Sequence, residues 1–141
     1  MIQARTDADD KWIVSADPVV EPSSVYLFDR KAGTLTKLYT GRPELVGAPL
    51  VPMWPVEIKS RDGLTLPSYL TLPANADANR DGKADAPVPM VLFVHGGPWG
   101  RDGYGYNSYA QWLASRGYAV LQVNYRASTG FGKYCSTAGI R

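Results

Sequence analysis

The chain has 141 residues, of which 45% are hydrophobic and 20% charged, and its formal net charge is +2. This composition is typical of a globular protein with its own core and argues against disordered and fibrous classes. Without a block of like charge or an apolar run long enough to span a bilayer, neither a nucleic-acid partner nor a membrane partner is expected.

Strand-forming residues dominate the first third of the chain. Trp12–Val14 is a short apolar run, Val25–Asp29 is rich in aromatic and aliphatic residues, and Leu35–Tyr39 alternates with period two. Lys31-Ala32-Gly33 supplies a turn, so we predict a hairpin with one buried face. Residues 41–53 contain three prolines and two glycines and are interpreted as a connector at a domain junction.

A second hairpin follows the connector. Val56–Lys59 and Leu64–Leu66 both alternate, and Asp62-Gly63 between them accepts the positive φ of a tight turn. Pro67 cannot donate a hydrogen bond to a neighbouring strand, which predicts an edge or a bulge for its strand.

The next segment is polar and is interpreted as an exposed loop. Its acidic residues have the spacing of the first half of a calcium loop, but the twelfth position holds Val88 in place of the usual glutamate. We therefore favour a solvated turn and assign no metal site. The residues in this pattern are Asp77, Asn79, Asp81, Gly82 and Asp85.

The last third predicts a βαβ unit with a parallel pair of strands. Met90–Val94 is apolar at every position, as in a strand covered on both faces, and Val120–Val123 forms the second strand. Between them, Asn107 or Ser108 caps a helix that runs to about Arg116. The residues expected on one face of this helix, and at its exit, are Tyr109, Trp112, Leu113 and Gly117.

The segment that suggests chemistry is His95-Gly96-Gly97-Pro98, at the carboxyl end of the first of these strands. Ligands of parallel sheets bind at that end, and consecutive glycines allow close approach of the backbone to a substrate. In α/β-hydrolases, a loop of this type offers a backbone N–H to the developing oxyanion. Gly97 is the candidate donor, since Pro98 has no N–H. The glycines could also serve only to turn the chain, but the βαβ context favours the functional interpretation.

Three stretches resemble the prolyl oligopeptidase family of serine peptidases, with the acylaminoacyl-peptidase and dipeptidyl-peptidase-like branch closest. They are Val91–Asp102, Gln111–Arg126 and Ser128–Gly132, and Pro55–Pro73 resembles the entry into the family's hydrolase domain. The resemblance implies a β-propeller followed by an α/β-hydrolase domain, a Ser-Asp-His triad and short peptides as substrates. It also implies that His95 takes the place of an oxyanion-hole tyrosine found in some members. No cofactor is expected.

The triad itself is not recognisable in these residues. A nucleophile elbow has the pattern Gly-x-Ser-x-Gly, whereas Leu113 and Arg126 stand two residues before Ser115 and Ser128. His95 is the only histidine, and its place in the motif makes it a poor general base. The resemblance implies that nucleophile, acid and base follow downstream, so we expect the 141-residue chain to be inactive alone.

The predicted fold class is therefore α/β, a partial α/β-hydrolase fold with an antiparallel hairpin before the βαβ unit. We expect residues 51–141 to form this part, and residues 1–50 to form a segment resembling the last blade of a β-propeller. The candidate site residues are His95, Gly96 and Gly97. Two alternatives stay open, namely an α/β-hydrolase esterase or lipase, and a non-catalytic binding module.

Other polar residues near the motif allow more than one interpretation. Arg101 and Asp102 could meet a substrate terminus, but pairing with each other is favoured. Arg126 is expected to bind nearby backbone carbonyls. Cys135 is the only cysteine and is expected to be an unreactive thiol, because no histidine is available to activate it.

Overall fold

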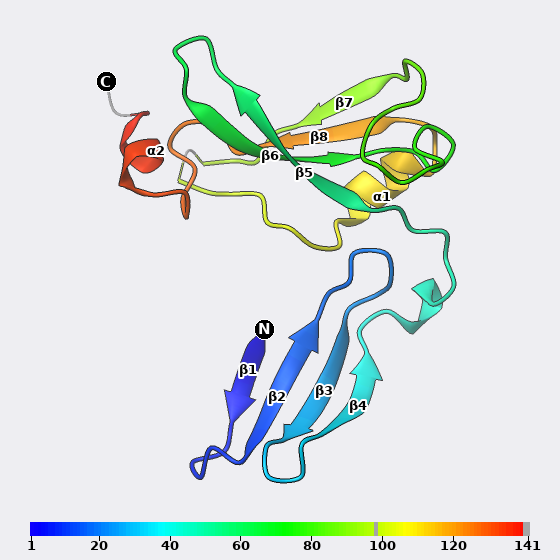
Figure 1. Cartoon of the computed structure of the whole chain (residues 1–141), viewed down its shortest axis with the longest axis vertical. Helices are drawn as coiled ribbons and strands as arrows, with labels where there is room; N and C mark the ends of the chain where they lie inside the picture. The colour runs from blue at the N-terminus through cyan, green and yellow to red at the C-terminus, as the bar shows by residue number, and fades with distance from the viewer. Residues whose placement is uncertain (98, 140–141) are drawn as a thin grey trace. The chain divides into compact units, whose positions relative to one another are not determined.

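The computed structural model describes residues 1–97 and 99–139, so Pro98 of the predicted motif lies outside the described residues. The chain divides into two compact units, Met1–Leu50 and Val51–Arg141. Each unit is built around one four-stranded sheet, and the second unit also carries two short helices. Figure 1 shows the labelled strands and helices of each unit.

The first unit is an antiparallel sheet whose strands follow one another in sequence order. One strand, β1, was not predicted: its four residues, Ile-Gln-Ala-Arg, include a single residue of high strand propensity, and all four are exposed. The expected buried face is also incomplete, since β4 is exposed along nearly its whole length. The strands are β1 (Ile2–Arg5), β2 (Lys11–Ala16), β3 (Ser24–Asp29) and β4 (Thr34–Thr40), followed by the 3-10 turn η1 (Pro43–Leu45).

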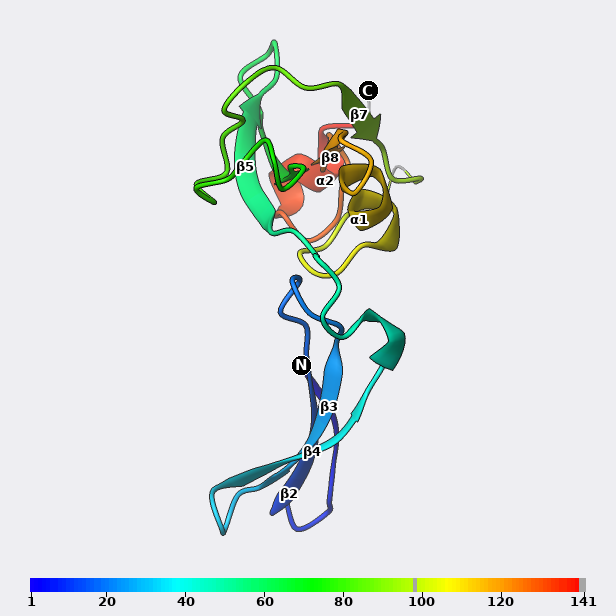
Figure 2. The ribbon, with the colours of Figure 1, turned by 90° about the vertical axis from the view of Figure 1, so that its right-hand side faces the viewer.

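The second unit has the strand order β5-β6-β8-β7, in which only β7 and β8 run parallel. The predicted hairpin and βαβ unit are therefore both present, with α1 packed against β8 and β6 (Figure 2). The elements are β5 (Met53–Lys59), β6 (Thr65–Thr71), β7 (Met90–Phe93), α1 (Ser108–Ala114), β8 (Ala119–Val123) and α2 (Lys133–Thr137).

The edge position predicted from Pro67 is wrong, because β6 lies inside the sheet between β5 and β8. Pairing of β6 with β8 begins one residue later, where Ser68 faces Val123. Pro67 contributes its carbonyl, which accepts the Asn124 N–H at 3.1 Å. A proline is tolerated here because this position requires an acceptor and no donor.

The prediction that β7 is covered on both faces is also wrong, because one face of the strand is exposed; β7 also forms the edge of the sheet. Met90 and Leu92 on one of its faces are each 57% exposed. A continuous apolar run indicates a strand made for burial, but it does not indicate which neighbours supply that burial.

Helix α1 has the predicted cap but a different buried face. The Asn107 side chain accepts a hydrogen bond from the Ala110 N–H at 3.0 Å, as an N-cap does. Tyr109 and Trp112 are more than half exposed, and Ala110, Gln111 and Ala114 face the core in their place. Small residues at the interface let the helix lie close to the sheet. In the part of the chain that the structure describes, no helix is long and apolar enough to cross a membrane.

Candidate functional site

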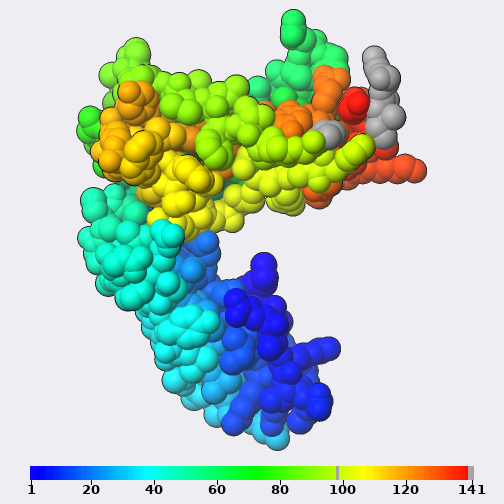
Figure 3. Space-filling model, turned by 180° about the vertical axis from the view of Figure 1, so that it is seen from behind, coloured from blue at the N-terminus to red at the C-terminus, as the bar shows by residue number. Residues whose placement is uncertain are grey.

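The candidate site is the loop that leaves the carboxyl end of β7, described over residues 95–97 and 99–102 and here called the His95 loop. It folds back tightly on itself. A Cβ atom on Gly100 would lie 2.7 Å from the Gly96 carbonyl oxygen, and one on Gly97 would lie 2.8 Å from the Trp99 nitrogen. Both positions therefore require glycine, whereas Gly96 has open space around it. Figure 3 shows the yellow-green residues that follow β7 at the surface of the second unit (Figure 3).

His95 is held from several directions. Its Nδ1 lies 2.8 Å from the Gly96 carbonyl oxygen and its Nε2 lies 2.9 Å from the Ser128 hydroxyl oxygen. The ring stacks on Tyr125 with 4.4 Å between centroids, and the Tyr125 hydroxyl donates to the His95 carbonyl at 2.9 Å. Because both ring nitrogens are hydrogen-bonded, the imidazole holds the loop in this conformation.

The C-terminal end of the His95 loop, at Asp102, is held by hydrogen bonds with two side chains at the end of β8. Asn124 accepts from the Asp102 N–H at 2.8 Å and donates to the Asp102 carbonyl at 3.3 Å. Gln122 donates to the Asp102 carboxylate at 3.1 Å. Both side chains are almost completely buried. The sequence analysis assigned no role to Gln122 and Asn124. Polar residues at alternating positions along an apolar strand can nevertheless indicate buried hydrogen-bonding side chains.

The middle of the loop is tied to the segment after β8 as well, because the Thr129 N–H donates to the Gly100 carbonyl at 2.9 Å. Residues 122–129 thus hold the loop at both ends and at its centre. The Gly97 N–H, by contrast, has no hydrogen-bond acceptor among the described residues, and Gly97 is exposed. A rigid backbone with an available donor is the arrangement that binds a developing anion.

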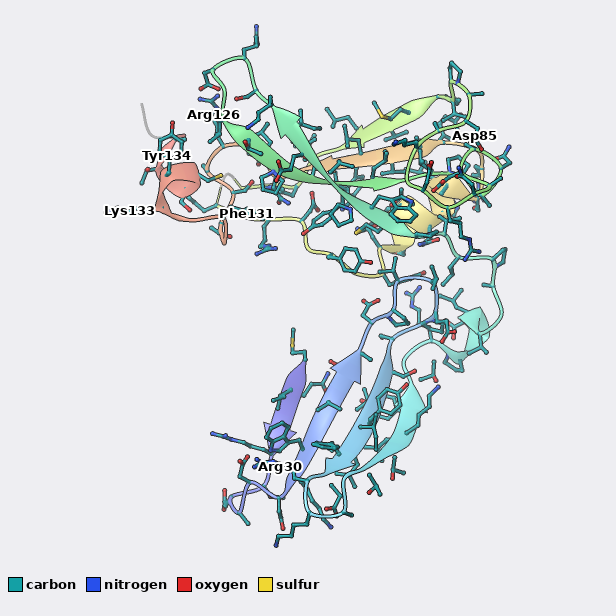
Figure 4. All side chains as sticks on the ribbon, in the orientation of Figure 1. Arg30, Asp85, Arg126, Phe131, Lys133 and Tyr134 are labelled. Carbon is teal, nitrogen blue, oxygen red and sulfur yellow. The ribbon has the colours of Figure 1, made fainter. Side chains whose placement is uncertain are left out.

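Two expectations about charged residues need correction. Arg101 does not pair with the Asp102 carboxylate; its guanidinium lies 4.6 Å from the centroid of the Phe131 ring. Arg126 does not bind backbone carbonyls; its Nη2 lies 2.9 Å from the Asp62 carboxylate, beside the β5–β6 turn (Figure 4). A hydrogen bond from the Ser60 hydroxyl, and then one from Arg126, lower the pKa of Asp62 to about 2.

Neither serine considered for a nucleophile elbow is available to attack a substrate. The Ser115 hydroxyl donates to the Trp112 carbonyl at 2.8 Å at the end of α1. Ser128 is completely buried against His95. Cys135 is a buried free thiol.

The polar loop between β6 and β7 is organised by its own hydrogen bonds. The Asp77 carboxylate accepts from the Trp54 indole N–H at 2.9 Å, the Asp81 N–H at 2.8 Å and the Gly82 N–H at 3.2 Å. Over the described residues, no group of three or more His, Cys, Asp or Glu side chains is placed to hold a metal ion.

Known proteins similar to this chain are peptidases. The chain is 64% identical to dipeptidyl aminopeptidase BIII of Pseudoxanthomonas mexicana over 98% of its own length and 20% of that protein. It is 35% identical to dipeptidyl peptidase family member 6 of Caenorhabditis elegans over 91% of its length and 19% of the relative. No protein-family model matches the chain.

Solved structures agree with these relatives. A puromycin-hydrolysing peptidase of Mycobacterium tuberculosis is 27% identical, with a TM-score of 0.71 over 89% of this chain and 19% of that structure. The relatives and structural neighbours are prolyl oligopeptidase-family proteins, so the chain is related to this family and the predicted resemblance is confirmed. It spans about a fifth of the length of the relatives it matches.

Proposed function

We propose that this chain is the oxyanion-binding segment of a serine peptidase that hydrolyses short peptides. The observation that carries the proposal is the exposed Gly97 N–H, which has no acceptor among the described residues and follows the carboxyl end of β7. The similarity of the chain to peptidases over almost its whole length supports the reaction class. Ser115 and Ser128 are both unsuitable nucleophiles, so the Ser-Asp-His triad is assigned to polypeptide outside these 141 residues.

In this function, the Gly97 N–H donates to the carbonyl oxygen of the scissile bond as negative charge develops there. Its position is fixed before the reaction, because His95 and Asp102 hold the two ends of the loop. A fixed donor stabilises the oxyanion without reorganisation, and losing one such donor typically costs about 3 kcal/mol of transition-state stabilisation. His95 and Gly96 contribute by setting the path of the backbone.

The same proposal assigns a place in the larger protein to each unit. Residues 51–141 are the first part of an α/β-hydrolase domain, supported by the antiparallel hairpin followed by the parallel β7–β8 pair. Residues 1–50 are the end of a β-propeller, supported by four antiparallel strands in sequence order.

The proposal is tested by expressing a polypeptide that contains both this segment and the assigned triad. We expect it to cleave short peptide amides, and Gly97→Ala to lower kcat by about 100-fold to 1000-fold because the added Cβ displaces the donor. Gly103→Ala is the matched control, since open space surrounds Gly103 and it lies outside the candidate site. Cleavage of esters without cleavage of amides would contradict the peptidase function and favour an esterase.

The 141-residue chain provides a second test. A fluorophosphonate that reacts with activated serines should leave it unlabelled, because Ser128 is completely buried and the Ser115 hydroxyl donates to a backbone carbonyl and not to a base. Covalent labelling of Ser128 or Ser115 would show that the chain carries its own nucleophile.

A further inference from the structure

Arg101 differs from the other arginines that lie over aromatic rings. Arg30 lies over Trp12 and is also paired with Asp9, and Arg116 lies over Trp112 and donates to its carbonyl at 3.2 Å. Arg101 makes one long hydrogen bond, from Nε to the Asp102 carbonyl at 3.4 Å. Within the described residues, no acceptor binds either of its Nη groups. Both Nη groups of its guanidinium are therefore free to donate, at an exposed position.

The side chain of Arg101 is held in place although its donors are free. One face of the guanidinium lies over Phe131, at 4.6 Å from the ring centroid. On another side it lies so close to Gly130 that a Cβ atom there would overlap Nη1. Gly130 also has a φ of 85°, which favours glycine independently. A guanidinium restrained in this way loses little conformational freedom when it binds a ligand.

Arg101 also lies close to the candidate oxyanion donor. It follows Gly100, whose position is in contact with Gly96 and His95. Even a fully extended chain from Gly97 to Arg101 would span only about 14 Å, and this loop is folded back. A peptide whose scissile carbonyl lies at the Gly97 N–H can therefore place a group one or two residues away beside Arg101.

We propose that Arg101 is a specificity-determining residue that binds a carboxylate of the peptide substrate, an inference that rests on the proposed peptidase function. A planar guanidinium with two free Nη groups matches the two oxygens of a carboxylate in a bidentate pair. The carboxylate comes from an acidic side chain near the scissile bond or from the C-terminus of a short peptide. Both sources present the same group to Arg101.

The kinetic test uses the polypeptide that contains this segment and the triad. The substrates are tetra-alanine with a free C-terminus or a C-terminal amide, and the amidated peptides Ala-Glu-Ala-Ala and Ala-Gln-Ala-Ala. We expect kcat/KM to favour the charged member of one pair by tenfold or more, mainly through KM. The pair that shows the preference identifies the source of the carboxylate.

Arg101→Gln should abolish this preference, so that the charged and neutral members of a pair have the same kcat/KM, and Arg101→Lys should retain part of it. Arg116→Gln is the matched control, because Arg116 also lies over an aromatic ring but follows α1 and contacts Trp112 and Ser115 of that helix end. An unchanged preference in Arg101→Gln, or none in the wild type, would overturn the role of Arg101.

A binding test separates this inference from the proposed function. The four peptides are titrated into the 141-residue chain, and the amide resonance of Gly97 and the Nε resonance of Arg101 are followed by NMR. We expect the charged peptide to shift the Arg101 resonance with at least tenfold tighter binding than its neutral counterpart. Binding without hydrolysis by the longer polypeptide would refute the peptidase function alone. Hydrolysis without charge-dependent binding would refute the role of Arg101 alone.

A pair of glycine variants tests the restraint on the guanidinium. Gly130→Ala and Gly132→Ala both place a side chain at a φ near 85–88°, but only the first meets Arg101. We expect Gly130→Ala to reduce the charge preference severalfold and Gly132→Ala to preserve it. Equal preferences in the two variants would show that the Gly130 contact does not position Arg101.

Discussion

The Nε2 atom of His95 accepts its hydrogen bond from the hydroxyl of Ser128, at 2.9 Å. The direction follows from the other ring nitrogen. Nδ1 lies 2.8 Å from the Gly96 carbonyl, which can only accept, so Nδ1 carries the proton of the neutral ring. The Gly96 carbonyl therefore selects the Nδ1–H tautomer of His95, and the Ser128 hydroxyl donates to the ring nitrogen that carries no proton.

Ser128→Ala should leave this tautomer in place, because the Gly96 carbonyl still requires a proton on Nδ1. Because His95 is the only histidine, its two ring nitrogens can be identified without ambiguity by ¹⁵N NMR. We expect the Nδ1–H form both in the wild type and in Ser128→Ala. The variant should also lose about 1–2 kcal/mol of unfolding free energy, since a buried acceptor loses its donor. A wild type in the Nε2–H form would contradict the assignment.

Asp62 should make stability depend on pH in the acid range. Its pKa is about 2 in the folded chain against an ordinary value of 3.8, so its contribution to stability is complete above about pH 4 and is lost as the pH falls towards 2. Urea unfolding from pH 5 to 2 should show the wild-type advantage over Asp62→Asn shrinking in that window. Ser60→Ala should raise the pKa of Asp62 more than Arg126→Gln, because the Ser60 hydrogen bond is the larger cause. An advantage that persists undiminished at pH 2 would be inconsistent with this pKa.

Gly63 allows the cost of backbone conformation to be measured without steric overlap. Its φ is 84° and nothing lies within 4 Å of the place that an added Cβ atom would take, so Gly63→Ala changes little except the backbone preference. We expect a loss of about 1 kcal/mol in unfolding free energy, as is typical of a residue other than glycine in this conformation. Gly63→Asn should lose less, because asparagine tolerates positive φ. Equal losses for Ala and Asn would point to a different cause.

Asp77 should be the most important acidic residue of the loop between β6 and β7. It is 5% exposed and accepts hydrogen bonds from the Trp54 indole and from two backbone N–H groups. Asp77→Ala should lower the unfolding free energy by about 2 kcal/mol, as expected for buried bonds to a charged acceptor. Asp85→Ala should cost much less, because Asp85 is exposed and accepts one bond at 3.3 Å. Urea unfolding followed by circular dichroism measures both, and similar losses would refute this ranking.

The free edge of β7 should make the 141-residue chain prone to association. The strand has no charge or proline, and edge strands of this kind pair readily with other chains. Leu92→Lys should lower the aggregation rate in light scattering, whereas Tyr134→Lys should have little effect, because Tyr134 is 79% exposed but lies on a helix. A wild-type chain that stays monomeric and unfolds sharply would contradict this expectation.

The sequence predicted local structure well and neighbour relationships poorly. The β5–β6 hairpin followed from the Asp62-Gly63 turn, and the cap of α1 followed from Asn107, because both depend on residues a few positions apart. The edge position of β7 and the inner position of β6 depend on the order of strands in the sheet. Local periodicity does not encode that order.

The same distinction applies to the candidate site. The glycines of the His95 loop were found because the motif is contiguous in sequence. The residues that fasten it, Asn124 and Ser128, are distant in sequence from the residues they bind, and only the return of the chain through β8 brings them to the loop. The partner of Arg126 was missed for the same reason, since Asp62 lies on a separate hairpin.

The strand order β5-β6-β8-β7 also has a consequence for synthesis on the ribosome. β7 is made before β8, yet β8 is the strand that joins it to the sheet. The roughly 35 residues from Phe93 to Ser128 take about 2–7 s to translate at typical elongation rates. During that interval β7 and the His95 loop have no sheet to join. We therefore expect this loop to be among the last parts of the unit to become ordered, and nascent β7 to be a natural binding segment for chaperones.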